Sequence, residues 1–357
     1  MQVSILEQSV SVEGKPQNHT IQDSINLAVK AEKLGYKRFW VSEHHNHPAI
    51  VGTAPEIVMA AIGQSTKHIR IGSAGIMLPH YAPLKVAEQF RVLEAIAPGR
   101  IDLGLGRAPG SDGKTAYALN PNAQEDSEHF PANVRDLIAW VSDTPLIENH
   151  PFHNLKARPS GTSSPEIWML GTSDYGAQVA AHFGIPYCFA HFITDGRGVE
   201  RALDLYRTLY KPSKRFPNPI ATICVWALAA DTTEDAEHLF ASRMHWKYKR
   251  DNGELTAIDD PEKIGPFCGA GELDPPVVVA LPDPLPPCCG AGEFEPPVVL
   301  LPVPLPPLAE GAGELLPVPL PPLVVPLPLL LSGDGAGELE HCMAPGVESF
   351  PPLGQSA

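Results

Sequence analysis

The chain has 357 residues and a formal net charge of −15, from 26 basic and 41 acidic residues. This length suits one large domain or two ordinary ones. Because nucleic acid affinity depends largely on Lys and Arg that neutralise phosphates, the acidic charge argues against a nucleic acid partner. The same charge opposes attraction to an anionic membrane surface.

The cysteines and the amino-terminal residues indicate a reducing compartment. Cys188 and Cys224 are the only cysteines among the first 265 residues, and each lies in an apolar run, which is typical of buried thiols rather than of a disulfide framework. Residues 1–15 lack the basic, apolar and small-residue segments of a secretory signal. We therefore expect a cytoplasmic protein.

Residues 266–357 differ in composition from the rest of the chain. They contain no Lys or Arg, 22 of the 40 prolines and four copies of Gly-Ala-Gly-Glu, which begin at Gly269, Gly290, Gly311 and Gly335. Prolines remove the backbone donors that stacked repeats need, and six of them disfavour a membrane-spanning helix over 315–331. We predict a globular domain over 1–265 and a disordered, partly polyproline tail over 266–357. A frame-shifted reading frame would produce the same features.

Short apolar runs alternate with amphipathic segments through the first 265 residues. Seven runs fit buried strands, at 3–6, 38–42, 69–76, 101–105, 167–170, 186–190 and 221–228. A predicted helix follows each strand, at 20–34, 55–66, 83–97, 125–141, 173–183, 199–210 and 232–250. This alternation indicates an α/β protein with a parallel sheet, either a TIM-barrel-like (β/α)8 fold or an open doubly wound sheet. The tail offers no recognisable eighth β/α unit to complete a barrel.

Unusual polar residues follow the carboxyl ends of four predicted strands. Residues 43–47, Glu-His-His-Asn-His, follow the second strand, and residues 73–75 lie near the end of the third. Arg107 follows the fourth strand and residues 171–173 follow the fifth. Ligands bind at this edge in both barrels and open parallel sheets, so we expect a site there.

The segment 171–173, Gly-Thr-Ser, indicates a phosphate site because it leads from a strand into a helix. Free amides and hydroxyls at a helix start favour an anion, and the guanidinium of Arg107 would add charge and bidentate geometry. Two simpler interpretations remain open. The hydroxyl residues could serve only as an N-cap, and Arg107 could form a salt bridge to Glu43 or Asp102.

Three histidines within four residues suggest metal binding as an alternative. His45 and His47 would point the same way from an extended segment, and Glu43 or Asp195 could complete their ligand set. No Cys pair or His-Glu-x-x-His helix accompanies them, so we assign no metal. A single histidine suffices as an acid, a base or a hydrogen-bond donor.

Several of these segments together resemble the bacterial luciferase-like flavin monooxygenase family. The match covers most of residues 1–250 in order. The segments that carry it are Glu43-His44-His45-Asn46, Ala54-Pro55-Glu56, 71–79 (Ile-Gly-Ser-Ala-Gly-Ile-Met-Leu-Pro), 86–90 (Val-Ala-Glu-Gln-Phe), 98–110 (Pro-Gly-Arg-Ile-Asp-Leu-Gly-Leu-Gly-Arg-Ala-Pro-Gly) and 170–173 (Leu-Gly-Thr-Ser).

The resemblance implies a (β/α)8 barrel that binds reduced FMN and uses O2 to oxygenate a small organic substrate. Such an enzyme acts on paired donors with incorporation of molecular oxygen. By matching position, His44 would lie near the flavin ring and assist proton transfer. No cysteine stands beside Arg107, so the resemblance does not imply light emission.

The resemblance also implies a place for seven cofactor-binding residues. Ser73, Ala74 and Gly75 would line the isoalloxazine ring, with a cis peptide bond between Ala74 and Gly75. The 5′-phosphate would be held by a second set, Arg107, Gly171, Thr172 and Ser173. Residues 108–122 could cover the site, which must exclude water.

The implied partners are a small-molecule substrate, O2, a flavin reductase that supplies reduced FMN, and a second copy of the chain in a homodimer. Three other functions remain open from the sequence. They are a deazaflavin-dependent dehydrogenase on the same barrel, a metal-dependent hydrolase that uses His44, His45 and His47, and an inactive protein whose Pro-rich tail binds aromatic grooves of a partner.

Overall fold

The computed structural model describes residues 2–108, 110–264 and 277–278. The chain divides into two units, 1–301 and 302–357, and every element described below belongs to the first. The predicted Pro-rich tail lies outside the described residues, except for two residues of strand. Within the described part of the chain, no helix has both the length and the apolar character that a membrane span needs.

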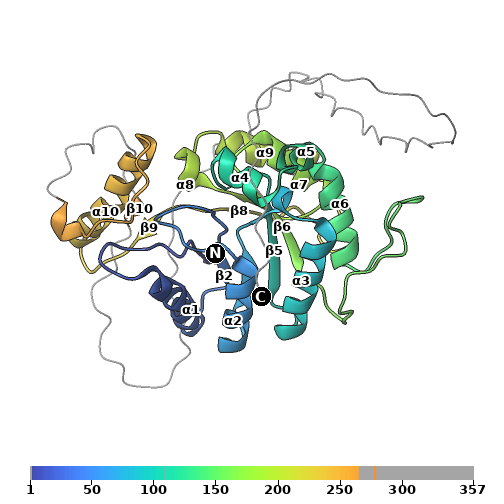
Figure 1. Ribbon diagram of the computed structural model, residues 1–357, viewed down its shortest axis with the longest axis horizontal. Coiled ribbons are helices and arrows are strands. Elements are labelled where there is room, and N and C mark those ends of the chain that lie inside the picture. The colour runs from blue at the N-terminus through green and yellow to red at the C-terminus, as the bar shows by residue number, and fades with distance from the viewer. Residues whose placement is uncertain (1, 109, 265–276, 279–357) are drawn as a thin grey trace, which may run out of the picture. The chain divides into compact units, whose positions relative to one another are not determined.

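Seven parallel strands form one curled sheet, as the alternating pattern predicted (Figure 1). In sheet order they are β1 (Ile5–Glu7), β2 (Arg38–Val41), β3 (Arg70–Ser73), β5 (Ile101–Gly106), β6 (Glu166–Gly171), β7 (Tyr187–Phe189) and β8 (Ala221–Ile223). A shorter strand, β4 (Ile76–Met77), continues the line of β3 and also pairs with β5. The chain has the TIM-barrel-like fold in seven β/α units.

Helices cover the outer face of this sheet and its carboxyl edge. In Figure 1, α1, α2 and α3 stand next to one another along the outer face. The helices are α1 (Gln17–Lys33), α2 (Pro55–Ser65), α3 (Pro83–Ile96), α4 (Gly113–Leu119), α5 (Ala123–Glu128), α6 (Phe130–Val141), α7 (Asp174–Phe183), α8 (His191–Thr194), α9 (Val199–Leu209) and α10 (Thr233–Asp251). Two short 3-10 turns, η1 (Leu78–His80) and η2 (Pro261–Lys263), complete the set.

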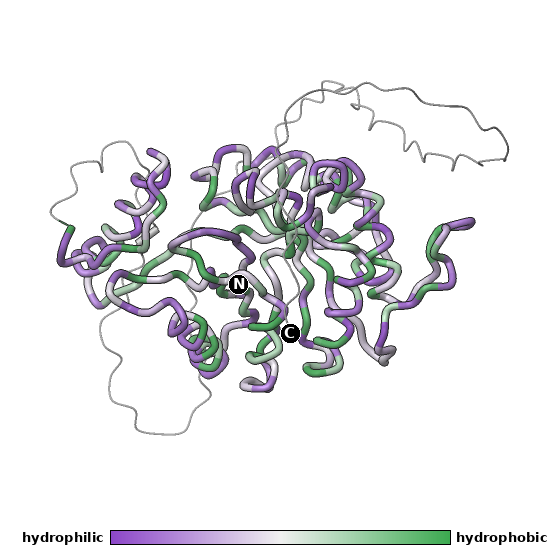
Figure 2. The backbone as a smooth tube through the Cα atoms, in the orientation of Figure 1, coloured by the Kyte–Doolittle hydropathy of each residue, from purple (hydrophilic) through white to green (hydrophobic). Residues whose placement is uncertain are grey.

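The strand register places the main core on one side of the sheet. Phe39, Ile71 and Ile101 lie side by side on β2, β3 and β5, and all are buried in the main core. Side chains alternate along a strand, so the next residues, among them Trp40 and Asp102, face the opposite side of the sheet. Figure 2 shows hydrophobic segments following the central strands.

Three predicted elements are interrupted, each at an identifiable place. The predicted strand over 69–76 divides into β3 and β4 at the cis Ala74–Gly75 bond, and the predicted helix over 125–141 divides into α5 and α6 at His129. The predicted strand over 221–228 divides into β8 and β9 (Ala227–Leu228). Hydrophobic periodicity predicts whether a segment is a helix or a strand, but it does not predict where its backbone hydrogen bonding is interrupted.

The sheet is open between its first and last strands. Among the described residues, β1 pairs only with β2, and β8 pairs only with β7. Residues Val277–Val278 form a short strand, β10, that pairs in parallel with β9 rather than with β1. The prediction that the chain lacks a recognisable eighth β/α unit therefore agrees with the described part of the fold.

A buried carboxylate joins the strands at their amino ends. Asp102 on β5 is fully buried and accepts hydrogen bonds from Arg38 Nε at 3.0 Å, Trp40 Nε1 at 2.9 Å and Arg70 Nε at 3.0 Å. The two arginines also approach Glu166 on β6, each at 3.2 Å. The network therefore spans four neighbouring strands.

We predict that Asp102→Ala lowers the free energy of unfolding by roughly 3 to 5 kcal/mol, because it leaves two largely buried guanidinium groups without their shared partner. Urea denaturation would measure this loss. Glu166→Ala is the matched control on the same network, and its loss should be smaller because water reaches Glu166. Equal losses for the two variants would contradict the central role of Asp102.

Candidate active site

The four loops that carry the predicted site residues meet at one edge of the sheet. Their strands, β2, β3, β5 and β6, are neighbours in the sheet and run in parallel. Their carboxyl ends therefore lie side by side, and α4, α5 and α8 lie at this same edge in Figure 1. The structure thus places the four predicted segments next to one another at the carboxyl edge of the sheet.

Glu43 joins the loops that follow β2 and β3. Its fully buried carboxylate contacts His45 Nε2 at 2.8 Å and accepts hydrogen bonds from the Met77 amide at 2.9 Å and from the Tyr81 hydroxyl at 2.7 Å. Burial and the negative charge of Glu43 raise the pKa of Tyr81, so this hydroxyl stays protonated and remains a donor. The contact fixes the segment in which His44 lies.

His44 is partly buried next to two polar neighbours. Its Nδ1 lies 3.2 Å from the Ser42 hydroxyl, its amide donates to the Gly52 carbonyl at 3.0 Å, and its ring lies 6.3 Å from the ring of His47. Burial, with a contribution from His47, lowers the pKa of His44 to about 4. The imidazole is therefore neutral at pH 7 and offers one ring nitrogen as a donor and the other as an acceptor.

The segment 73–75 lies at the carboxyl end of β3, next to β5. The peptide bond between Ala74 and Gly75 is cis, as the family resemblance implied. The Ser73 hydroxyl is buried and bridges the Gly104 backbone, donating to its carbonyl at 2.9 Å and accepting from its amide at 3.0 Å. A Cβ atom at Gly75 would lie 2.8 Å from the Gly104 carbonyl oxygen, so only glycine fits there.

Arg107 lies against the first turn of α7. Its guanidinium carbon stands 4.1 Å from the ring centroid of Tyr175, the second residue of that helix. The carboxylates considered as its salt-bridge partners are engaged elsewhere, because Glu43 binds His45 and Asp102 binds Arg38. Arg107 is exposed, and within the described residues its nitrogens form no ion pair with a carboxylate.

The start of α7 does not use its hydroxyl residue as an N-cap. Ser173 occupies the N-cap position with an extended backbone, but its side chain forms no capping hydrogen bond. Asp174 in the first turn is paired with Arg201 at 2.7 Å. Gly171 and Thr172 are half-buried beside it. The ordinary N-cap interpretation therefore does not account for Ser173.

The three clustered histidines point to different partners. His45 contacts Glu43, whereas His47 Nδ1 accepts hydrogen bonds from the amides of Ala49 and Ile50, each at 3.1 Å. Among the described residues, no group of three or more His, Cys, Asp or Glu side chains is arranged to hold a metal ion. The geometry gives the metal-hydrolase alternative no support.

Residues 110–122 contact the neighbouring loops. Asp112 caps α4 through the Lys114 and Thr115 amides, and Asn46 donates to the Thr115 hydroxyl at 3.1 Å. Asn120 donates to the Pro79 carbonyl at 2.8 Å. The segment is thus attached to the loops after both β2 and β3.

Cys188 and Cys224, the cysteines among the described residues, are free thiols, as predicted. Cys188 is buried with Trp40 and Trp168, and Cys224 and Ala74 pack against the same cluster. Burial raises the pKa of Cys188, and it raises that of Cys224 to about 11. Both thiols are therefore protonated near neutral pH and are poor nucleophiles.

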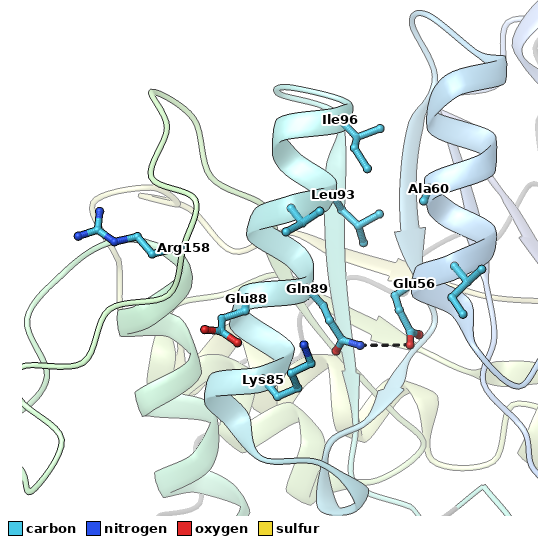
Figure 3. A pocket seen from close by; sticks show the side chains of 10 residues that line it. Glu56, Ala60, Lys85, Glu88, Gln89, Leu93, Ile96 and Arg158 are labelled. Carbon is cyan, nitrogen blue, oxygen red and sulfur yellow. Dashed lines mark hydrogen bonds between the residues drawn. The ribbon is translucent and has the colours of Figure 1, made fainter.

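A separate hollow lies between α2 and α3 on the outer face (Figure 3). Ala60, Leu93 and Ile96 contribute apolar side chains, and Gln89 donates to Glu56 at 3.3 Å. None of its lining residues belongs to the candidate site at the strand ends. We therefore do not assign the hollow to catalysis.

The curled parallel sheet and the polar site at its carboxyl edge define a TIM-barrel-like α/β protein. Its family follows from the sequence, because the model described as luciferase-like monooxygenase matches residues 1–280. The chain belongs to the luciferase-like monooxygenase family.

Named relatives agree with this assignment. The chain is 45% identical over 239 residues to the uncharacterized protein YwcH of Bacillus subtilis (strain 168), covering 67% of this chain and 71% of that protein. It is 37% identical over 267 residues to the N-acetyl-S-alkylcysteine monooxygenase of the same organism, covering 74% and 78%. The crystal structure of apo-MsnO8 superposes with a TM-score of 0.68 at 35% identity, covering 76% of this chain and 82% of that chain.

Sequence reasoning did not identify the role of Glu43 in joining two loops. It considered Glu43 only as a metal ligand or a partner of Arg107, whereas the carboxylate binds His45, Met77 and Tyr81. Tyr81 itself carried no sequence signal, because an isolated tyrosine after a predicted strand is common. An acidic residue directly after a buried strand was the one available hint.

We predict that the lowered pKa of His44 makes the fold sensitive to acid. The ordinary pKa of 6.5 applies to the unfolded chain and about 4 to the folded one, so protonation favours unfolding. The wild type should lose up to about 3 kcal/mol more stability than His44→Asn as the pH falls between these values, and none above them. Melting curves across pH would measure the difference.

The exposed histidine His19 on α1 supplies the control, since His19→Asn should follow the wild-type acid dependence. Parallel wild-type and His44→Asn stability profiles would show that the neutral state of His44 is wrongly assigned.

Proposed function

We propose that this protein is a monooxygenase that uses reduced FMN and O2 to oxygenate a small organic substrate. The observation that carries the proposal is the position of Arg107 over Tyr175, at the start of α7. This arrangement places a cation that has no carboxylate partner among the described residues beside the first amides of the helix and the Ser173 hydroxyl, which forms no capping hydrogen bond. Such a set of donors suits a phosphate dianion.

The residues present fit the two ends of FMN. At one end, Arg107 and the residues 171–173, Gly-Thr-Ser, would hold the 5′-phosphate. At the other end, Ala74 and Gly75 offer a small surface for the isoalloxazine ring. The buried Ser73 would support this surface through its bonds to the Gly104 backbone.

His44 would provide the proton-transfer group at the ring end. Its lowered pKa keeps it neutral, so it can accept a proton on one nitrogen while the other stays hydrogen-bonded. When bound, reduced FMN supplies two electrons, so that one atom of O2 enters the substrate and the other leaves as water. The segment 108–122 would exclude bulk water from this edge.

The proposal also covers the type of reaction, the partner proteins and the cellular location. The similarity to N-acetyl-S-alkylcysteine monooxygenase supports an oxygen-inserting reaction rather than another oxidoreductase activity. A separate flavin reductase would supply the reduced cofactor, and we propose a cytoplasmic homodimer from the family resemblance. We also retain 1–265 as the catalytic domain and 266–357 as a separate tail.

A deazaflavin-dependent dehydrogenase is the second candidate, because the same phosphate cradle would serve either cofactor. The two candidates differ in their use of oxygen. The monooxygenase requires reduced FMN and O2, whereas the dehydrogenase transfers hydride without O2. Binding of each cofactor to the purified chain separates them.

We predict that Arg107→Ala weakens the binding of reduced FMN by roughly ten- to hundredfold, the loss expected for charge-assisted hydrogen bonds to one guanidinium. Anaerobic titration of the full chain would measure the dissociation constant. Riboflavin, which lacks the phosphate, should bind the variant and the wild type alike.

Lys114→Ala is the matched control, since it removes an exposed positive charge from the neighbouring α4. It should leave FMN binding within about twofold of the wild type. If both variants lose affinity equally, the effect is general electrostatics and Arg107 is not a phosphate ligand. Binding of reduced deazaflavin but not of FMN would favour the dehydrogenase.

A further inference from the structure

An arginine on α10 is held between two indole rings beside the candidate active site. Arg243 lies with its guanidinium carbon 4.2 Å from the Trp226 ring centroid and 4.5 Å from that of Trp246. Its NH2 group donates to the Gln8 side-chain oxygen at 2.9 Å, just after β1. Three elements far apart in sequence thus fix one cation in place.

This aromatic cluster is continuous with the residues near His44. The rings of His44 and His47 are 6.3 Å apart, and the rings of His47 and Trp246 are 6.0 Å apart. On the other side, the rings of Trp226 and Phe192 are 5.8 Å apart. These rings form an aromatic wall that extends from His44 to Arg243. Its members are His44, His47, Trp246, Trp226 and Phe192.

The positive charge of Arg243 has no carboxylate within ion-pair distance in the described part of the chain. Glu7 is the nearby acid, but its Oε1 atom accepts hydrogen bonds from the Ser9 amide at 2.7 Å and the Ser24 hydroxyl at 3.3 Å. Burial, with repulsion from Arg250, lowers the pKa of Arg243 to about 10. The group still carries its charge at neutral pH, at a cost that a bound anion would offset.

The other cations of α10 are already paired with acids. Arg250 lies 2.8 Å from Asp251, and Lys247 lies 3.1 Å from Asp195 and 3.4 Å from Asp251. Arg243 therefore differs from them in its proximity to two indole rings and in having no acidic partner among the described residues. These are the properties of an anion-recognition group rather than of a surface salt bridge.

We propose that Arg243 recognises the carboxylate of the substrate, and that the aromatic wall beside it binds an apolar chain between this carboxylate and the oxygenated atom. The proposal rests on the proposed function, because it places the substrate beside His44. A guanidinium offers bidentate hydrogen bonds to a carboxylate, and indole faces bind apolar surface with little loss of conformational freedom. The substrate class is thus an apolar carboxylic acid.

The test compares a carboxylic acid with its neutral amide on the full-length protein. The probes are 4-phenylbutyrate and 4-phenylbutanamide, which differ in charge but share the same chain. Their binding is followed by the intrinsic tryptophan fluorescence, to which Trp226 and Trp246 beside Arg243 contribute. The wild type should bind the acid at least about tenfold more tightly than the amide, as expected for a charge-assisted pair.

Arg243→Gln should remove this preference, and Arg243→Lys should retain part of it, because Lys keeps the charge without the bidentate geometry. Lys249→Gln is the matched control on the same helix, because Lys249 is paired with Asp259 at 2.8 Å, and it should keep the acid preference within about twofold. If Arg243→Gln fails to fold, the wild-type comparison and Arg243→Lys still decide the question.

The proposal is overturned if the wild type binds both probes equally, binds neither, or if Arg243→Gln retains the preference. None of these readings requires flavin. A separate anaerobic FMN titration of the same preparations therefore shows whether the proposed cofactor, rather than the substrate site, has been misassigned.

Discussion

One buried carboxylate, that of Asp102, sets the arrangement on which the rest of the fold depends. It joins Arg38 and Trp40 on β2 to Arg70 on β3, from its own position on β5. The three strands are held together at their amino ends, and because they run in parallel their carboxyl ends lie at the same edge of the sheet. The loops that carry the candidate site therefore begin from a common rim.

At that rim the electrostatics differ between the two ends of the proposed cofactor site. A neutral His44 lies at one end, kept neutral by burial, and Arg107, which has no ion-pair partner in the described part of the chain, lies at the other beside the Tyr175 ring. Glu43 lies beneath the first end and joins two loops through His45 and Met77. Under the proposed function, the first end would serve proton transfer and the second would bind the phosphate.

Much of this could be read from the sequence because β/α alternation and strand-end polarity are local patterns. These patterns predicted the seven β/α units, and they predicted that the segments around His44 and Arg107 meet at one edge of the sheet. The family resemblance added the cis bond after Ala74. Contacts between distant segments could not be read this way, and Arg243 received no functional prediction because its indole and Gln8 partners come from three separate elements.

The placement of the Asp102 network opposite the candidate site has an evolutionary consequence. Residues that hold the strands together occupy one end of the sheet, and residues that would meet a substrate occupy loops and α10 at the other. Loop sequences can therefore diverge, or be exchanged by protein engineers, with little cost to the scaffold. A family built on this division can acquire new substrates while it keeps one inherited framework.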